Sequence, residues 1–253
     1  MTPALVGVAV SLFAITGALL GMSLHRKLPE HHVGSESRDA VKLCIGLVAT
    51  MTALVLGLVT ASAKSHFDSV SATVRHTAQD LLTLDRLLAR YGPETAGIRG
   101  VLKSAVAVRT EAIWPQDGSR QAVLDAPAAS TELEAIPDMI RRLAPADERQ
   151  RDLKKRAEDL GEKLLQLRWL ASGEVESSIP VVFIGTLVCW LTITFTVFGL
   201  VAPGNRTVRA VFLVSALSVG SAVFLILEMD TPFHGLMKVH VGPMRYALSH
   251  LNQ

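Results

Sequence analysis

Charge is missing from four long stretches of this 253-residue sequence. None of its 48 charged side chains lies within 1–24, 43–63, 177–205 or 210–227. Crossing the hydrocarbon core of a membrane as a helix takes roughly 20 apolar residues, and a segment in lipid must satisfy its own backbone hydrogen bonds, which favours helix. A soluble core helix would carry charge on its outer face every few residues. The sequence therefore predicts an all-α, polytopic membrane protein with four transmembrane helices.

The sequence also lacks the patterns of catalytic and cofactor sites. It has no G-x-S-x-G, no phosphate-binding loop and no pair of histidines that flanks an acid at i, i+4. The middle of the spans holds no carboxylate and no arginine ladder, which argues against a proton relay and a voltage sensor. Residues 64–178 carry 17 basic and 18 acidic side chains, too balanced for a nucleic-acid surface. We predict no enzyme activity, cofactor, metal site or nucleic-acid partner.

Cysteine is scarce, and both cysteines fall inside predicted spans. Cys44 lies near one end of its span and Cys189 nearer the middle of another. Their different depths argue against a disulfide. We expect two buried apolar thiols.

The stretch between the second and third spans is charged but helical. No glycine or proline occurs from Ser65 to Tyr91, so the second span is expected to continue as one helix until Tyr91-Gly92-Pro93. Apolar residues at heptad spacing predict a coiled-coil seam in that extension and another before the third span. The first seam holds Phe67, Val70, Val74, Thr77, Leu81, Leu84 and Leu88, and the second Leu153, Ala157, Leu160, Leu164, Leu167 and Ala171.

Shorter helices are predicted within this insert at 93–114 and 131–143, the latter interrupted by Pro137, with a loop at 115–130. The insert is therefore expected to form largely as extensions of the second and third transmembrane helices. The predicted segments are 1–63 (two transmembrane helices and a polar link), 64–178 (helical extramembrane segment), 179–228 (two transmembrane helices) and 229–253 (short interfacial tail).

Small residues recur along the first two spans. Gly17 and Gly21 form a small-xxx-small pair in the first span. Such residues let helix backbones approach closely in lipid, so a tight oligomer interface and ordinary packing within one subunit both remain open. In the second span the candidate pore or helix-packing face holds Gly46, Thr50, Ala53, Gly57 and Ala61.

Hydroxyl groups within the spans are the remaining polar features. Such groups can line a pore without buried charge, or they can bond only to the carbonyl groups of their own helix. The residues concerned are Thr50, Thr52, Thr186, Thr192, Thr194 and Thr196.

Basic residues predict the orientation. Arg26, Lys27, Arg38 and Lys42 follow the first span, and Arg206 and Arg209 link the last two. The positive-inside rule places both links in the cytoplasm. Both termini and residues 64–178 are then expected outside.

Several pieces of sequence together resemble the bestrophin-like family of bacterial membrane proteins. They are Ala40-Val-Lys-Leu-Cys-Ile-Gly46 entering the second span, Glu111-Ala-Ile-Trp-Pro115, and Leu227-Glu-Met-Asp-Thr-Pro-Phe-His-Gly235 leading to Val241-Gly-Pro243. The last motif supplies the candidate family residues at the end of the fourth helix: Glu228, Asp230, Pro232, Phe233 and Gly235.

The resemblance implies a distant similarity to bestrophins, which are pentameric anion channels with four spans per subunit and a cytoplasmic helical domain. The sequence departs from that pattern in having no run of acids like the bestrophin calcium clasp and no aromatic neck in the second span. The charge rule also places the helical domain outside.

Two function hypotheses follow. The first is a homo-oligomeric ion channel in a bacterial inner membrane, with an inorganic ion as its partner besides the lipid bilayer. The resemblance makes an anion the expected ion and a pentamer the expected assembly. The alternative is a non-conducting membrane scaffold or signalling module whose helical segment binds a partner.

Overall fold

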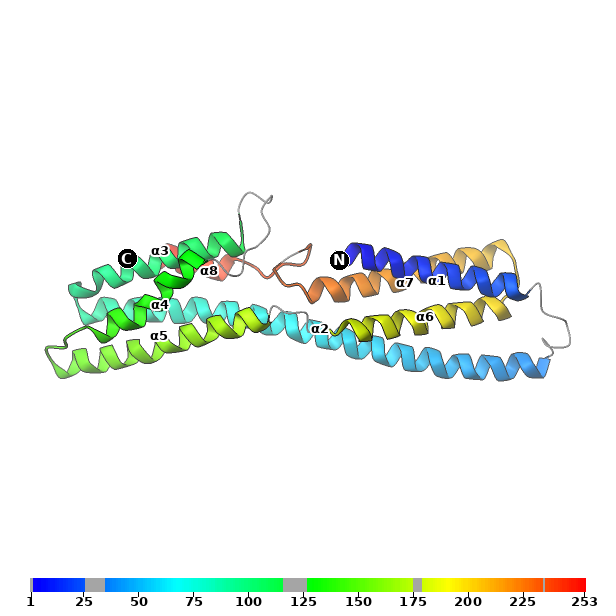
Figure 1. Ribbon diagram of the computed structural model, residues 1–253, viewed down its shortest axis with the longest axis horizontal. Coiled ribbons are helices and arrows are strands. Elements are labelled where there is room, and N and C mark those ends of the chain that lie inside the picture. The colour runs from blue at the N-terminus through cyan, green and yellow to red at the C-terminus, as the bar shows by residue number, and fades with distance from the viewer. Residues whose placement is uncertain (1, 26–34, 116–126, 175–178, 234) are drawn as a thin grey trace. The chain divides into compact units, whose positions relative to one another are not determined.

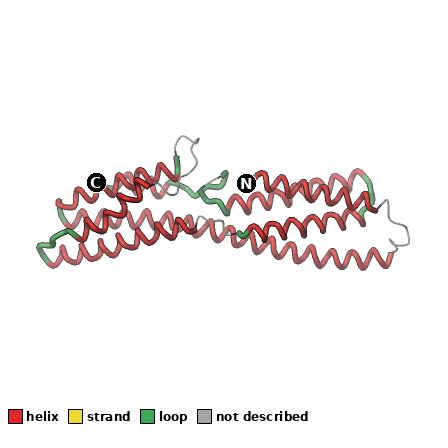
Figure 2. Tube along the Cα trace, viewed as in Figure 1, coloured by secondary structure: helices red, strands yellow, loops and turns green. Residues whose placement is uncertain are grey.

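The computed structural model describes residues 2–25, 35–115, 127–174, 179–233 and 235–253. Within these ranges the chain forms helices and loops and no strand, as Figure 2 shows. The all-α prediction is confirmed. The helices labelled in Figure 1 are α1 (Pro3–His25), α2 (Ser35–Tyr91), α3 (Ala96–Ile113), α4 (Pro127–Arg141), α5 (Glu148–Glu174), α6 (Val181–Val201), α7 (Arg206–Met229) and α8 (Gly242–His250), with a short 3₁₀ turn η2 (Pro93–Thr95) before α3.

Four helices in the described part of the chain are long and apolar enough to cross a membrane. They are Pro3–His25, Val41–Tyr91, Val182–Val201 and Arg206–Met229. Each overlaps one of the uncharged stretches. The four predicted transmembrane helices are thus confirmed.

The second of these helices continues without interruption beyond its apolar part. Helix α2 starts at Ser35, before the uncharged stretch, where Lys42 and Asp39 form an ion pair of 2.9 Å one turn apart. It ends at Tyr91, and Gly92 follows with a φ of 153°, a backbone conformation that favours glycine. This course of α2 is compatible with the predicted extension of the second span.

The third span differs from the expectation. Helix α5 ends at Glu174, and α6 starts at Val181 behind Pro180, which has extended backbone angles of −58° and 134°. Because the residue before proline is driven from helical angles, the helix cannot run on smoothly here. The extramembrane segment therefore extends α2, whereas α5 and α6 are separate helices.

The chain divides into two compact units. Met1–His66 and Ser177–Asp230 form the first, here called the membrane unit. Phe67–Glu176 and Thr231–Gln253 form the second, here called the extramembrane unit.

In the membrane unit, α1 packs against α6 and α7 through small residues. A Cβ atom added to Gly7 would lie 2.9 Å from the carbonyl oxygen of Gly220, and one added to Gly17 would lie 2.8 Å from that of Thr192. At Gly21 such an atom would collide with the carbonyl oxygen of Thr196. The small-residue stripe of the first span thus serves packing within the subunit.

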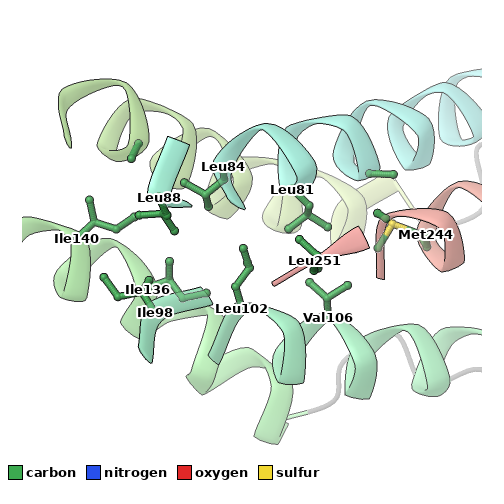
Figure 3. Packing of buried hydrophobic residues seen from close by; sticks show 13 residues of the cluster. Leu81, Leu84, Leu88, Ile98, Leu102, Val106, Ile136, Ile140, Met244 and Leu251 are labelled. Carbon is green, nitrogen blue, oxygen red and sulfur yellow. The ribbon is translucent and has the colours of Figure 1, made fainter. Parts of the chain in front are cut away.

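The extramembrane unit has a leucine-rich core, seen from close by in Figure 3. Leu81, Leu84 and Leu88 of α2 are buried there, and α5 contributes Ala157 with Leu160 and Leu164 packed against it. The two predicted seams therefore share one core. Helices α3, α4 and α8 complete it through Leu102, Ile136, Ile140, Met244 and Ala247.

Smaller differences concern the insert's short helices. Helix α4 starts at Pro127, earlier than predicted, and continues through Pro137 to Arg141. Residues 116–126 of the predicted loop lie outside the described residues, as do Arg26 and Lys27.

The sequence predicted a separate interfacial tail at 229–253, but Thr231–Gln253 belong to the extramembrane unit. Ala247 and Leu251 are fully buried in the core of the extramembrane unit. The ζ-ammonium of Lys103 donates to the carbonyl oxygen of Leu251 at 3.0 Å. The mild amphipathicity of the tail therefore matches a protein core.

Candidate functional site

The candidate face of α2 is exposed in the subunit. Gly46, Thr50, Ala53, Gly57 and Ala61 are all solvent-accessible in the isolated chain. At 3.6 residues per turn they fall within an arc of roughly 80° on the helix surface. We call these five residues the α2 small face.

Space is open in front of this face. A Cβ atom added to Gly46 or to Gly57 would meet no atom of the described residues within 4 Å. Only 11% of the apolar window of α2 is buried, against 44% for α1. The same residue types are thus packed in α1 and uncovered in α2.

The opposite side of α2 anchors it to the membrane unit. Ile45, Thr52 and Ala63 are buried, and Val55 and Leu56 pack against a cluster from α1, α6 and α7. Helical periodicity places this side well over 90° from the α2 small face. One side of the span therefore packs within the subunit, and the other has no cover among the described residues.

The span hydroxyls bond to their own helices. Thr50 donates to the carbonyl oxygen of Gly46 at 2.8 Å, and Thr52 to that of Val48 at 2.7 Å. Thr186, Thr192, Thr194 and Thr196 make the same i−4 bond at 2.7 to 2.9 Å. Their hydrogens are used locally, so within the membrane they offer a passing anion no free donor.

Four of the five candidate residues at the end of α7 are buried. Glu228 and Asp230 are each 3% exposed, and both are engaged in polar or electrostatic interactions. Pro232 and Phe233 are buried as well, and Gly235 has a φ of 85°, in the left-handed region where glycine is favoured. These candidate residues shape the chain where it leaves α7.

Two motifs that were identified separately in the sequence meet within the extramembrane unit. The ring of Trp114 lies edge-on to Phe233, with centroids 5.5 Å apart and planes at 75°. The indole N–H of Trp114 donates to the carbonyl oxygen of Val239 at 2.9 Å, and the N–H of Val239 donates to Pro232 at 2.8 Å. Trp114 thus holds the turn that follows α7.

An ion pair inside the extramembrane unit was missed by sequence reasoning. Arg99 of α3 binds both carboxylate oxygens of Asp85, at 2.8 and 3.0 Å, and the Asp85 side chain is 1% exposed. Arg99 also donates to the carbonyl oxygen of Gln253, and the N–H of Asn252 donates to Asp85. The hydrogen bond with Asp85 raises the pKa of Arg99 above its ordinary value. A signal was present in the sequence, because Asp85 sits beside core positions of the first heptad seam.

Tyr91 lies buried at the end of α2. Its hydroxyl group has no hydrogen-bond partner among the residues that the structure describes. Burial, followed by the charges of Glu94 and Asp147, raises the pKa of Tyr91 above 10.0. The group therefore stays neutral to higher pH than a free tyrosine.

The remaining hollows among the described residues are small and mostly apolar. An apolar cavity of about 130 Å³ lies in the extramembrane unit, between α2, α3, α4 and α5, and includes Arg109 in its wall. Ligand pockets usually measure roughly 300–1,000 Å³, so this cavity is small. Among the described residues no group of three His, Cys, Asp or Glu side chains is placed to hold a metal ion.

Both cysteines are free thiols at exposed positions. The expectation of buried thiols was wrong, because Cys44 and Cys189 lie on helix faces that the subunit leaves uncovered. Exposed apolar positions are normal for spans that face lipid or another subunit.

Comparison with known proteins finds one matching family and a similar solved structure. The family described as Bestrophin-like domain matches residues 12–244. The fold is similar to the crystal structure of a mutant bacterial bestrophin homolog from Klebsiella pneumoniae, with a TM-score of 0.63, 14% sequence identity and coverage of 96% of each chain. The comparison with curated proteins gives no match.

Proposed function

Because this chain belongs to the Bestrophin-like family, we propose that it is one subunit of a homo-oligomeric ion channel in a bacterial cell membrane. The α2 small face lines or borders the central path, and an anion is the permeant ion. By likeness to bestrophins, the expected assembly has five subunits.

The exposure of the α2 small face carries this proposal. In lipid, helices associate through small residues that permit close backbone contact. The α1 stripe does this inside the subunit, where Gly7 and Gly17 meet carbonyl oxygens of α7 and α6. A Cβ atom added to Gly46 or Gly57 of α2 meets no described atom within 4 Å, so a further copy of the chain or the path between copies can cover this face.

The lining of that path would be small and uncharged. Gly46, Ala53, Gly57 and Ala61 present hydrogen or methyl groups, and the hydroxyl hydrogen of Thr50 is committed to Gly46. Apolar constrictions can gate a channel by excluding water. Conduction through this segment would therefore depend on its width and wetting.

Reconstitution tests the proposal. The purified protein in liposomes should release chloride under a salt gradient, and its native mass in detergent should correspond to more than two copies. An intact higher oligomer that passes no anion or cation under varied voltage, pH and calcium would refute the channel. A monomer or dimer would favour the non-conducting scaffold, because neither leaves an obvious central path.

Cysteine substitution tests the role of the α2 small face. In a background with Cys44→Ala and Cys189→Ala, a charged thiol reagent in water should react with Thr50→Cys or Gly57→Cys and reduce flux. The matched control is Leu217→Cys on α7, whose side chain is 54% exposed. Equal effects at both places would show that the face has no special access to water.

The orientation is part of the proposal. The basic residues Arg206 and Arg209 support cytoplasmic links, with both termini and residues 64–178 outside. In the same background, Thr83→Cys on the exposed side of α2 should react with an impermeant reagent added to intact spheroplasts. Reaction only after the membrane is opened would place the extramembrane unit in the cytoplasm instead.

A further inference from the structure

Three arginines occupy the exposed face of α2 beyond the membrane span. Arg75, Arg86 and Arg90 are all exposed. Eleven residues separate Arg75 from Arg86, which is three helical turns and about 20° of rotation. Arg75 and Arg86 therefore share one face of the extramembrane part of α2.

No acid on this stretch of α2 neutralises them. The acids of α2 beyond the span are Asp68, Asp80 and Asp85. Asp68 lies seven residues before Arg75, nearer the span, and has an interaction of its own. Asp85 is held by Arg99 of α3, and Asp80 lies 2.8 Å from the ammonium group of Lys163 on α5. Both carboxylates are thus turned toward neighbouring helices and balanced there.

Among the described residues, the hydrogen bonds of these arginines involve only a neutral group. Arg75 donates to the hydroxyl of Ser71 at 3.1 Å. No ion pair within 4.0 Å joins Arg75, Arg86 or Arg90 to an acid among the described residues. Within the described residues, these three positive charges are therefore not paired with an acid.

We propose that Arg75 and Arg86, with Arg90 beside them, form rings of positive charge around the axis of the assembled channel and select anions over cations. This inference rests on the proposed function. The membrane part of α2 has no charge and no free hydroxyl donor on its small face, so selection must come from charges outside it. Rings of arginine or lysine favour anions at a pore, because clustered charge raises the local concentration of the opposite ion.

Lipid headgroups are a poor fit to the same charges. Arg86 follows Lys64, the first charged residue after the span, by 22 positions, which is roughly 33 Å along a helix. The headgroup layer reaches only about 5–8 Å beyond the hydrocarbon core. Mobile anions in water are the ligand that can reach all three arginines.

The test compares two variants with the same change in net charge. Arg75→Gln/Arg86→Gln removes the charge and keeps polar side chains of similar length. Arg151→Gln/Arg156→Gln removes two exposed charges from α5 and is the control. Reversal potentials under a NaCl gradient give the ratio of chloride to sodium permeability for each protein.

The α2 variant should lower that ratio about threefold or more in 10 mM salt and less in 1 M salt, because the Debye length falls from roughly 30 to 3 Å. The control should match the wild type, and Arg75→Glu/Arg86→Glu should favour sodium. An unchanged ratio in the α2 variants overturns the inference and leaves the channel standing.

A second result would also overturn it. If the arginines pair with acids of a neighbouring subunit, Arg75→Gln/Arg86→Gln should lower the oligomer's native mass without changing ion preference. Failure of the channel itself is seen separately, since the wild type would then carry no current.

Discussion

The two halves of α2 are one continuous helix, but the subunit uses them differently. In the membrane half, Leu43 is 78% and Leu54 is 74% exposed. In the extramembrane half, Leu84 and Leu88 are each 1% exposed. The subunit folds around the second half and leaves the first half largely bare. We infer that the extramembrane half stabilises the subunit, whereas the membrane half is available for contacts with other subunits.

The largest expected effect comes from the ion pair of the extramembrane half. Asp85→Ala leaves the largely buried guanidinium of Arg99 without its carboxylate, and breaking a buried ion pair in this way costs about 3–5 kcal/mol. Thermal or denaturant unfolding in detergent, followed by circular dichroism, measures the loss. Replacing both residues, as in Asp85→Leu/Arg99→Met, should recover much of it.

A surface pair provides the control. Arg141 and Glu162 are separated by 2.9 Å, but both side chains are more than half exposed. Glu162→Ala should leave unfolding unchanged, since water already screens that pair. If Asp85→Ala were equally harmless, the extramembrane half of α2 would not depend on its buried charge.

The next effect compares the two halves directly through the same substitution. Leu84→Ala removes a fully buried side chain from a packed core, which typically costs roughly 2–5 kcal/mol. Leu54→Ala should leave the subunit's unfolding nearly unchanged, because lipid tails are as apolar as leucine. Native mass measured for both variants shows whether Leu54 contributes to assembly instead.

Equal destabilisation by both leucine variants would contradict this difference between the two halves of α2. It would mean that the membrane half of α2 is part of the folded core in the assembled protein. A lower native mass for Leu54→Ala with unchanged subunit unfolding would support this difference, since the membrane half would then act only between subunits.

The sequence predicted the elements of this fold well. Missing charge located four spans, and the absence of glycine and proline from Ser65 to Tyr91 predicted the continuity of α2. Both features act within a single segment, so no knowledge of a partner was needed. The heptad seams were predicted for the same reason, because each helix must bury its own apolar stripe.

The sequence could not decide what covers each face. Gly17 and Gly21 in α1 have the same spacing as Gly57 and Ala61 in α2, but only the first pair is packed within the subunit. The difference depends on which helix lies opposite, and periodicity carries no such information. The prediction for the tail was wrong for the same reason, because Leu251 is buried by helices from elsewhere in the chain.

The smallest expected effect concerns Tyr91, at the far end of the extramembrane half. Tyr91→Phe removes a buried hydroxyl without a described partner, so the free energy of unfolding at neutral pH should change by no more than about 1 kcal/mol. Burial raises the pKa of Tyr91 above 10.0, so the folded state favours the neutral hydroxyl group. The stability that this preference contributes is complete below the pKa of the unfolded state and is lost as pH rises through the pKa of the folded state. The wild type should therefore lose stability relative to Tyr91→Phe only above pH 10, as denaturant unfolding at pH 8 to 11 would show. Parallel curves over that whole range would mean that the tyrosinate gains water or a cation on ionising, and that this end of α2 is more open than its packing indicates.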